Sequence, residues 1–385
     1  MTVAVRSEPV SALRGRITAY SRPRRIPISA VVEIIATCNF SCQHCYIAPN
    51  AAREDVMSLE QAELIFTRLA AAGTLSLLLT GGEVFTHRQF AEIYLAAKRR
   101  GLLPNVNTNG YLIGERWADF LAEWPPEMVS ISLYGLSEER YRTVTGIPNA
   151  FGRVVRALGL LRERGVKFEL KCPAMTLTVD EIPAMRDFAA AHGASFRFDT
   201  VISPEEKGSD APLALQLAPP RVVALEEEMD PGFSNALRLL ERPKAGDPGR
   251  LYHCGGGMTN ISVNVHGGVS TCVTSRQTVG NLLEESFEGV WEAMAAKVER
   301  RLPDHHPCHG CSLRPMCYSC PAVVEQVTGS PIGYVQQYCA MTHLKAFKLG
   351  LHPTGIPRTV TEGIPAGIPT ARASAARALP ILSFG

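Results

Sequence analysis

No uninterrupted apolar run in the 385-residue sequence approaches the roughly 20 residues that a membrane-spanning helix needs. The opening stretch, MTVAVRSEPVSALRGR, also lacks the apolar core of a signal peptide. The sequence therefore predicts no membrane partner, and the cytoplasm is the expected location. In that reducing compartment disulfides are rare, so the clustering of the eleven cysteines favours metal binding.

The sequence also lacks a dominant sign of charge. Its 39 Lys and Arg residues nearly balance 37 Asp and Glu residues, which leaves a formal charge of +2. This balance argues against nucleic acid as the principal partner. With 46% hydrophobic residues, the chain is long enough to bury a sizeable core and to form more than one domain.

Composition divides the chain into five parts. Residues 1–28 are rich in arginine and are expected to form an extended basic arm, followed by an α/β domain over 29–202. A connecting segment, 203–250, leads to a cysteine-rich domain at 251–350. The tail, 351–385, is biased toward Pro, Ala and Gly and is expected to be disordered.

The α/β domain alternates β-rich runs with amphipathic helical patterns. Strands are predicted at 31–36, 75–80, 103–108, 128–134, 167–175 and 195–202, and helices at 58–73, 87–101, 150–165 and 180–193. Each predicted helix ends in a glycine, as C-caps often do. Six βα units predict a parallel sheet and are too few for an eight-stranded barrel, so an open, partial (β/α)6 barrel is expected.

Three cysteines follow the first predicted strand directly, in the stretch CNFSCQHCY. Cys38, Cys42 and Cys45 therefore lie at the carboxyl end of a strand, where parallel α/β folds place their catalytic groups. Three thiolates on one loop can bind three irons of a cubane cluster and leave the fourth without a protein ligand. A zinc knuckle completed by His44 is the alternative on spacing alone.

The end of the second strand favours the cluster. Gly81 and Gly82 let backbone groups approach a ligand closely, and Glu83 can accept a hydrogen bond from an ammonium. With these motifs in this order, the chain resembles the radical S-adenosylmethionine (SAM) superfamily, whose CxxxCxΦC loop and GGE motif match these positions. Val84 departs from the usual GGEP.

The resemblance implies a [4Fe–4S] cluster on Cys38, Cys42 and Cys45, with SAM chelating the open iron. It further implies reductive cleavage of SAM to a 5′-deoxyadenosyl radical that abstracts hydrogen from a substrate. An electron donor such as flavodoxin or ferredoxin is therefore an expected partner.

Other SAM contacts are implied less directly. Asn109 follows the third strand and Ser132 ends the fourth, where related enzymes bind ribose or carboxylate. Arg142 resembles the arginine that pairs with the SAM carboxylate in peptide-acting relatives. Strand-end capping by Asn109 and Ser132, and a solvated helix charge for Arg142, are the alternatives. Tyr134 stands where many relatives have aspartate.

Seven further cysteines lie near the carboxyl end, at positions 254, 272, 308, 311, 317, 320 and 339. Five residues between two CxxC pairs are too few for a usual zinc ribbon, although zinc stays an alternative. The pattern resembles the SPASM extension of radical SAM enzymes, which holds two auxiliary iron–sulfur clusters. The resemblance implies that Cys308, Cys311, Cys317 and Cys339 hold the second, and that Cys254, Cys272 and Cys320 hold the first.

One cysteine, Cys172 on the fifth predicted strand, belongs to neither pattern. Lys171 and Cys172 should point to opposite faces, so one of them faces the barrel lumen. A thiol in the lumen could donate hydrogen to a substrate radical. More often, a strand cysteine is a small buried hydrophobe.

The resemblance favours a precursor peptide as substrate, because SPASM proteins mostly modify ribosomally made peptides. The expected outcome is oxidative, a cross-link or a dehydrogenation. Val273 stands where sulfatase-maturing relatives carry a catalytic aspartate, which disfavours formylglycine formation. Only about 28 residues precede the first strand, so a separate leader-binding protein is a candidate partner. A peptide epimerase, an enzyme acting on a sugar or nucleoside, and a non-catalytic zinc scaffold are the alternatives.

Overall fold

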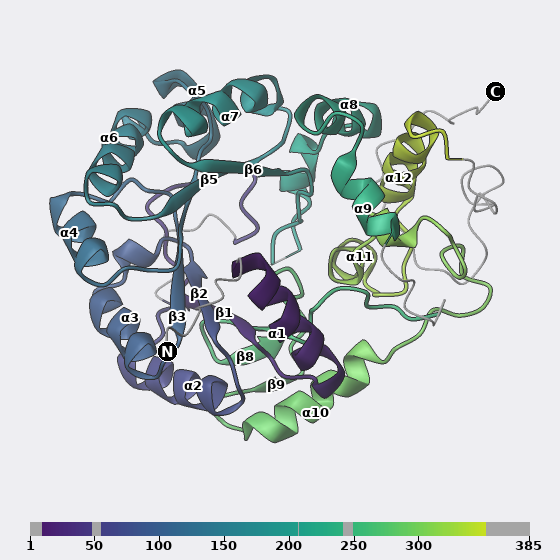
Figure 1. Ribbon diagram of the computed structural model, residues 1–385, viewed down its shortest axis with the longest axis horizontal. Coiled ribbons are helices and arrows are strands. Elements are labelled where there is room, and N and C mark those ends of the chain that lie inside the picture. The colour runs from purple at the N-terminus through teal and green to yellow at the C-terminus, as the bar shows by residue number, and fades with distance from the viewer. Residues whose placement is uncertain (1–9, 48–54, 207, 242–248, 352–385) are drawn as a thin grey trace, which may run out of the picture.

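The computed structural model describes residues 10–47, 55–206, 208–241 and 249–351 (Figure 1). The predicted disordered tail lies outside these residues from position 352 onward.

The described residues form one nine-stranded sheet in the order β6-β5-β4-β3-β2-β1-β7-β8-β9. Its strands are β1 (Ser29–Ile35), β2 (Ser76–Gly81), β3 (Leu103–Thr108), β4 (Val129–Ser132), β5 (Phe168–Pro173), β6 (Ser195–Asp199), β7 (Asn260–Val263), β8 (Gly268–Ser270) and β9 (Gly280–Asn281). Strands β1 to β6 pair in parallel with their sequence neighbours. The predicted partial barrel of six parallel strands, followed by a cysteine-rich region, is confirmed.

Helices α2 to α7 cover the outer side of the curved sheet, while α8, α9, α11 and α12 gather beside β6 (Figure 1). The α-helices are α1 (Val10–Arg24), α2 (Leu59–Ala71), α3 (Phe90–Arg99), α4 (Glu115–Glu123), α5 (Glu138–Thr145), α6 (Ala150–Glu163), α7 (Ile182–Ala191), α8 (Pro219–Met229), α9 (Ser234–Glu241), α10 (Phe287–Val298), α11 (Pro321–Thr328) and α12 (Gln336–Lys348). Short 3-10 helices are η1 (Val84–Thr86), η2 (Val179–Glu181), η3 (Ala211–Leu215) and η4 (Arg314–Met316).

Local sequence explains the best predicted elements. Helix α2 begins with a capping box, in which the Ser58 hydroxyl accepts from the Gln61 backbone and the Gln61 side chain accepts from the Ser58 backbone. The glycines expected to end four helices all adopt positive φ, for example 93° at Gly73. Leu77 and Leu79 on β2 are fully buried against the helices.

The cysteine-rich region extends the barrel sheet, which the sequence did not predict. Strand β7 pairs in parallel with β1, so that Val263 lies beside Val32. A hairpin then returns as β8, with Gly267 at φ 83° in its turn. Because β8 is antiparallel to β7, it runs away from the first cysteine loop, and Cys272 follows two residues after its end at Ser270.

The prediction of an extended basic arm is wrong for residues 10–24, which form α1. Tertiary contacts hold the end of this helix against the cysteine-rich region. Arg22 donates to the His253 carbonyl at 3.0 Å, and Arg25 donates to the Trp291 carbonyl at 3.1 Å. The Trp291 indole donates to the Arg25 carbonyl in return, at 2.7 Å. The partners lie more than 200 residues away, so no local pattern could indicate them.

Candidate functional site

A cavity of about 510 Å³ opens at the carboxyl ends of the parallel strands. Its lining brings together the cysteine loop and the ends of β2 to β6, including Cys38, Cys42, Cys45, Gly81, Gly82, Asn109, Ser132, Lys171 and Cys172. Glu83 and Arg142 are not among the described residues that line this cavity. The structure therefore collects most of the predicted barrel residues around one space.

The cysteine loop is held in place from below by helix α5. The backbone amide of Ser41 donates to the Thr145 carbonyl at 3.0 Å, and that of Gln43 donates to the Val144 carbonyl at 3.1 Å. Burial raises the pKa of the Cys38 thiol to about 12, and the nearby charges of Glu83 and Cys45 act in the same direction. The three thiols thus lie close enough to affect one another.

The donor set fits an iron–sulfur cluster better than one zinc ion. Four ligands around zinc bring their sulfurs within about 4 Å of one another, since each Zn–S bond is about 2.3 Å. Among the described residues, no three His, Cys, Asp or Glu side chains are placed to hold a single metal ion. Three thiols that converge at a wider spacing suit a multinuclear cluster.

The two glycines at the end of β2 are required by close backbone contacts. A Cβ at Gly81 would lie 2.0 Å from the Ile35 carbonyl oxygen, and one at Gly82 would lie 2.2 Å from the Thr37 carbonyl oxygen. The Gly82 amide donates to Ile35 at 2.7 Å, and the Glu83 amide donates to Thr37 at 3.0 Å. The end of β2 is therefore joined to the segment that leads into the cysteine loop.

Glu83 does not face the cavity, contrary to its expected role as acceptor for a ligand ammonium. Its fully buried carboxylate accepts from the Phe85 amide at 3.1 Å, the Thr108 hydroxyl at 2.8 Å and the Asn109 amide at 2.7 Å. Burial raises the pKa of Glu83 to about 7, and these hydrogen bonds oppose that rise. The carboxylate holds the loop after β3 in place.

Asn109 joins this loop to the cysteine loop. Its side-chain amide donates to the side-chain oxygen Oδ1 of Asn39 at 2.8 Å and approaches the Cys38 sulfur at 3.9 Å. Its own carbonyl oxygen accepts from the Tyr111 amide at 3.0 Å. Asn109 is buried, yet it borders the cavity, as expected for a ligand contact.

Ser132 and Tyr134 border the cavity at the end of β4. Tyr134, whose role the sequence left open, is hydrogen-bonded with Ser132 and with the thiol of Cys42. Its ring lies 5.4 Å from that of His44. Tyr134 is therefore part of the wall around the cysteine loop. Sequence reasoning missed this because an aromatic residue at a strand end resembles ordinary core.

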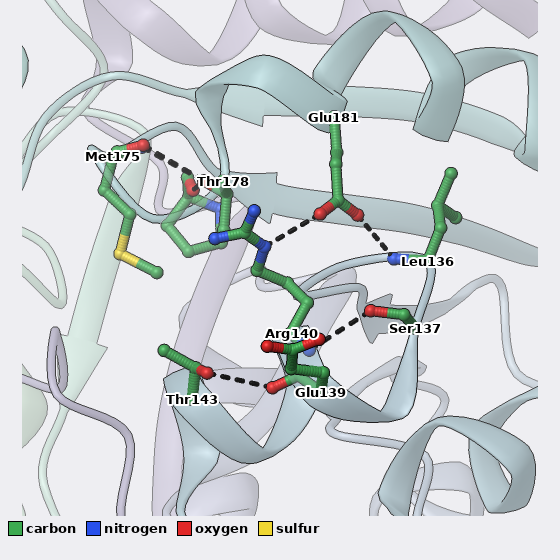
Figure 2. Close-up of polar contacts among 9 residues, drawn as sticks. Leu136, Ser137, Glu139, Arg140, Thr143, Met175, Thr178 and Glu181 are labelled. Carbon is green, nitrogen blue, oxygen red and sulfur yellow. Dashed lines mark hydrogen bonds and ion pairs between the residues drawn. The ribbon is translucent and has the colours of Figure 1, made fainter.

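Arg142 is exposed on α5 and points away from the site. Its neighbour Arg140 instead makes the fixed ion pair, donating to Glu181 at 2.7 Å (Figure 2). The second oxygen of Glu181 accepts from the Leu136 amide at 2.7 Å. The network ties the loop after β4 to the segment after β5. For Arg142, the structure favours the solvated helix charge over a ligand contact.

Lys171 and Cys172 are neighbours on strand β5, and their contacts show how each side chain is directed. Lys171 lines the cavity, and burial lowers its pKa to about 8, with the charges of Arg197, Glu169 and Glu83 also acting on it. The Cys172 thiol donates to the Pro173 carbonyl at 3.4 Å and lies beside Thr178, which also donates to that carbonyl. Cys172 is 2% exposed. Both Lys171 and Cys172 border the cavity, but the Cys172 thiol is directed to the Pro173 carbonyl, near the segment before α7.

Two polar atoms on the cavity wall have no hydrogen-bond partner among the described residues. They are Nδ1 of His44 and Oδ1 of Asn107, both buried. Buried polar atoms are normally paired, so each marks a position where a bound molecule would complete the contacts.

A second polar cavity of about 240 Å³ lies beside the first, between β1, β7 and β8. Arg276 pairs there with Glu206 at 3.0 Å and with Glu33 at 3.6 Å, and its guanidinium lies 4.2 Å from the centre of the Tyr46 ring. These contacts connect Tyr46, the residue after Cys45, to the segments that carry Glu33, Glu206 and Arg276. No sequence signal pointed to it, because each member stands alone in the chain.

The seven C-terminal cysteines form two groups. The three-cysteine group is Cys254, Cys272 and Cys320, and the four-cysteine group is Cys308, Cys311, Cys317 and Cys339. Besides burial, the pKa of Cys320 is raised by Cys272 and Cys254, and that of Cys308 is raised by the other three members of its group. The two ligand sets that the resemblance implied stay a prediction, and their sulfur ligands are of the type that holds iron–sulfur clusters.

Two family models match the chain. One, described as "Radical SAM superfamily", matches residues 32–189, and the other, "Iron-sulfur cluster-binding domain", known as SPASM, matches residues 254–312. In the described part of the chain, no helix combines the length and apolar character needed to cross a membrane.

Among curated proteins, the antilisterial bacteriocin subtilosin biosynthesis protein AlbA of Bacillus subtilis is 24% identical over 316 residues, which cover 77% of this chain and 70% of AlbA. An AdoMet-dependent heme synthase of Methanosarcina barkeri is also 24% identical, over 80% of this chain and 94% of that protein.

Among solved structures, Streptococcus suis SuiB bound to S-adenosylmethionine aligns with a TM-score of 0.63 at 17% identity, covering 86% of this chain and 82% of that one. The structure of anSMEcpe with bound AdoMet and Cp18Cys peptide has a TM-score of 0.63 at 19% identity. The alignment covers 84% of this chain and 97% of the anSMEcpe chain. At these identities the likeness shows a shared fold.

Proposed function

Because the chain belongs to the radical SAM superfamily and carries a SPASM domain, we propose that it oxidatively modifies a ribosomally made peptide, by cross-linking or dehydrogenation. It is a radical SAM enzyme that uses a [4Fe–4S] cluster with SAM and auxiliary iron–sulfur clusters. When bound and reduced, the SAM cluster supplies the 5′-deoxyadenosyl radical. The proposal concerns the substrate, the bond changed and the residues that hold the cofactors.

The chain's own residues have distinct tasks in this proposal. Cys38, Cys42 and Cys45 would hold the SAM cluster, while the three-cysteine and four-cysteine groups would hold the auxiliary clusters. Gly81 and Gly82 give the backbone access to SAM, and Asn109 and Ser132 contact it from the ends of β3 and β4. Glu83 acts indirectly, because its carboxylate is used to orient Asn109.

The single observation that carries the oxidative reaction is the full set of seven auxiliary cysteines. Loss of two hydrogens needs one hydrogen atom to pass to the 5′-deoxyadenosyl radical, which becomes 5′-deoxyadenosine. The second leaves as a proton, with its electron passing to an auxiliary cluster. An epimerase would instead return a hydrogen atom to carbon, and the thiol of Cys172, a residue that borders the cavity, is directed to the Pro173 carbonyl.

Several relatives act on peptides according to their names. They include AlbA, the sporulation killing factor maturation protein SkfB, and PqqA peptide cyclase. SuiB has been solved with its precursor peptide SuiA. A separate leader-binding protein and a flavodoxin or ferredoxin as electron donor complete the proposed set of partners.

The heme synthase relatives favour a second candidate, a small-molecule substrate, because one of them is covered over 94% of its length. The test is whether substrate stimulates SAM cleavage. Peptides translated from short reading frames beside this gene are incubated with reconstituted enzyme, dithionite and SAM, and 5′-deoxyadenosine is quantified. A peptide that raises 5′-deoxyadenosine and changes mass supports the proposal. Stimulation by a tetrapyrrole or sugar alone would contradict it.

A further inference from the structure

Two buried hydroxyls beside the three-cysteine group have no hydrogen-bond partner among the described residues. They belong to Tyr252, two residues before Cys254, and to Thr271, directly before Cys272. Each of these residues is 1% exposed, so bulk solvent does not reach either hydroxyl. An unpaired buried hydroxyl is rare enough in folded proteins to call for an explanation.

Both hydroxyls belong to the surroundings of the three thiols. Tyr252 stands two residues before Cys254 and belongs to the buried core against which Cys320 packs. Thr271 lies across Gly256 from Cys254, because a Cβ at Gly256 would be 3.4 Å from the Cys254 sulfur and 3.6 Å from the Thr271 Cβ. One aromatic and one aliphatic hydroxyl thus flank the same sulfurs.

The four-cysteine group offers a comparison. There, the Cys317 sulfur already accepts from the Thr342 hydroxyl at 3.4 Å and from the Ser319 amide at 3.4 Å. In this group, the Thr342 hydroxyl is thus already hydrogen-bonded to a cysteine sulfur. At the three-cysteine group, both hydroxyls miss the cysteine sulfurs, and the donors are backbone amides: Gly256 donates to Cys254 at 3.4 Å, and Ala322 and Val323 donate to Cys320. A hydroxyl donor that is buried, unpaired and next to thiolates fits an acceptor that a cluster would bring.

We infer that the Tyr252 and Thr271 hydroxyls donate hydrogen bonds to sulfurs of the first auxiliary cluster and set its reduction potential. The inference rests on the proposed ligands Cys254, Cys272 and Cys320. A donor's positive end stabilises the more negative, reduced cluster, so both hydroxyls raise the potential. A higher potential makes this cluster the better acceptor for an electron that leaves the substrate.

The test is an EPR-monitored redox titration. It uses full-length protein carrying Cys38→Ala, Cys42→Ala and Cys45→Ala, reconstituted with iron and sulfide, so that only auxiliary clusters contribute. Tyr252→Phe and Thr271→Val each remove one hydroxyl at nearly constant shape. Both should lower one of the two auxiliary potentials, leave the other unchanged and keep the iron content. The unchanged potential serves as an internal reference.

Tyr94→Phe is the matched control, because Tyr94 is equally buried but donates to the Trp124 carbonyl at 2.7 Å within the barrel. Equal potentials for Tyr252→Phe and the control would overturn the inference and assign the hydroxyl to Glu325, whose Oε1 is also unpaired. A raised potential or loss of iron would also overturn it, because removal of a phenolate ligand has those effects. If the parent protein binds no auxiliary iron, the proposed ligands fail instead.

Discussion

The barrel site and the three-cysteine group satisfy their polar atoms in opposite ways. At the barrel site, Glu83 accepts three hydrogen bonds and Asn109 is engaged through both its side-chain oxygen and its nitrogen. At the three-cysteine group, the hydroxyls of Tyr252 and Thr271 are buried without partners. The comparison suggests that the protein alone fixes the frame of the SAM site, whereas the first auxiliary site gains its last contacts from the cluster.

The largest effect should come from removing the barrel cysteines. Replacing Cys38, Cys42 and Cys45 by alanine should abolish 5′-deoxyadenosine formation, because these three thiols are the proposed ligands of the SAM cluster and line the cavity. Wild-type protein should bind about eight to twelve irons, and the variant about four fewer. Iron and sulfide assays with product chromatography check both values. Undiminished 5′-deoxyadenosine, or stoichiometric zinc without sulfide, would contradict the ligand assignment.

Glu83→Ala should weaken SAM binding by about 1.5 to 3 kcal/mol, since charge-assisted hydrogen bonds that hold Asn109 are lost. The loss is indirect, so Glu83→Gln, which keeps an acceptor for the Asn109 amide, should bind SAM more tightly than Glu83→Ala. Isothermal titration of reconstituted protein measures both affinities. Equal affinities for wild type and Glu83→Ala would show that the frame around Asn109 does not depend on this carboxylate.

Lys171 and Arg142 provide a matched pair of cations. Lys171 lies next to Ser132 in the strand register and lines the cavity, whereas Arg142 is exposed. Lys171→Met should therefore lower SAM affinity about tenfold or more, as expected when a buried ion pair to the SAM carboxylate is lost. Arg142→Gln should have little effect. Decarboxylated SAM should bind wild type and Lys171→Met equally, and the reverse ranking of the two variants would restore the role first expected of Arg142.

The same lysine predicts a pH dependence. Burial lowers its pKa to about 8, with Arg197 acting in the same direction and Glu169 and Glu83 opposing it. The ammonium is charged below that value and neutral above it, so SAM affinity should fall as pH rises through about 8. Lys171→Arg stays charged throughout. Its affinity should therefore be flat over this range, and a parallel fall in both proteins would assign the titration to another group.

Cys172→Ala should have the smallest effect on catalysis. The thiol donates to the Pro173 carbonyl and lies beside Thr178, and this contact directs it away from a substrate radical. The variant should keep product formation, with a loss of stability of about 1 kcal/mol from the small cavity. Thermal unfolding and product assays separate the two quantities. A stable variant that cleaves SAM but stalls before product would contradict the assigned orientation.

The sequence allowed prediction of the parts that local patterns encode. Strand and helix periodicity located β1 to β6 and the helices that end at Gly73 and Gly101, and motif spacing located the cysteines. It could not show that α1 is a helix docked by Arg25 on Trp291, because the stabilising partner is 266 residues away. The same holds for β7, whose pairing with β1 depends on a contact between remote segments.

Side-chain direction was the other limit. Strand alternation showed that Lys171 and Cys172 face opposite sides but could not say which faces the lumen. A motif placed Glu83 at the site without revealing that its carboxylate turns away from the cavity toward Thr108. Arg142 matched a motif and yet lies on the solvent side of α5.

The most direct test of the proposed reaction is the mass of the peptide product formed in heavy water. Reconstituted enzyme, SAM, dithionite and a peptide encoded beside the gene should give a product 2 Da lighter than the substrate, with no deuterium at carbon. Cys172→Ala should give the same product. A wild-type product that loses no hydrogens and gains one deuterium from the solvent, together with a stalled Cys172→Ala variant, would contradict oxidation and identify an epimerase.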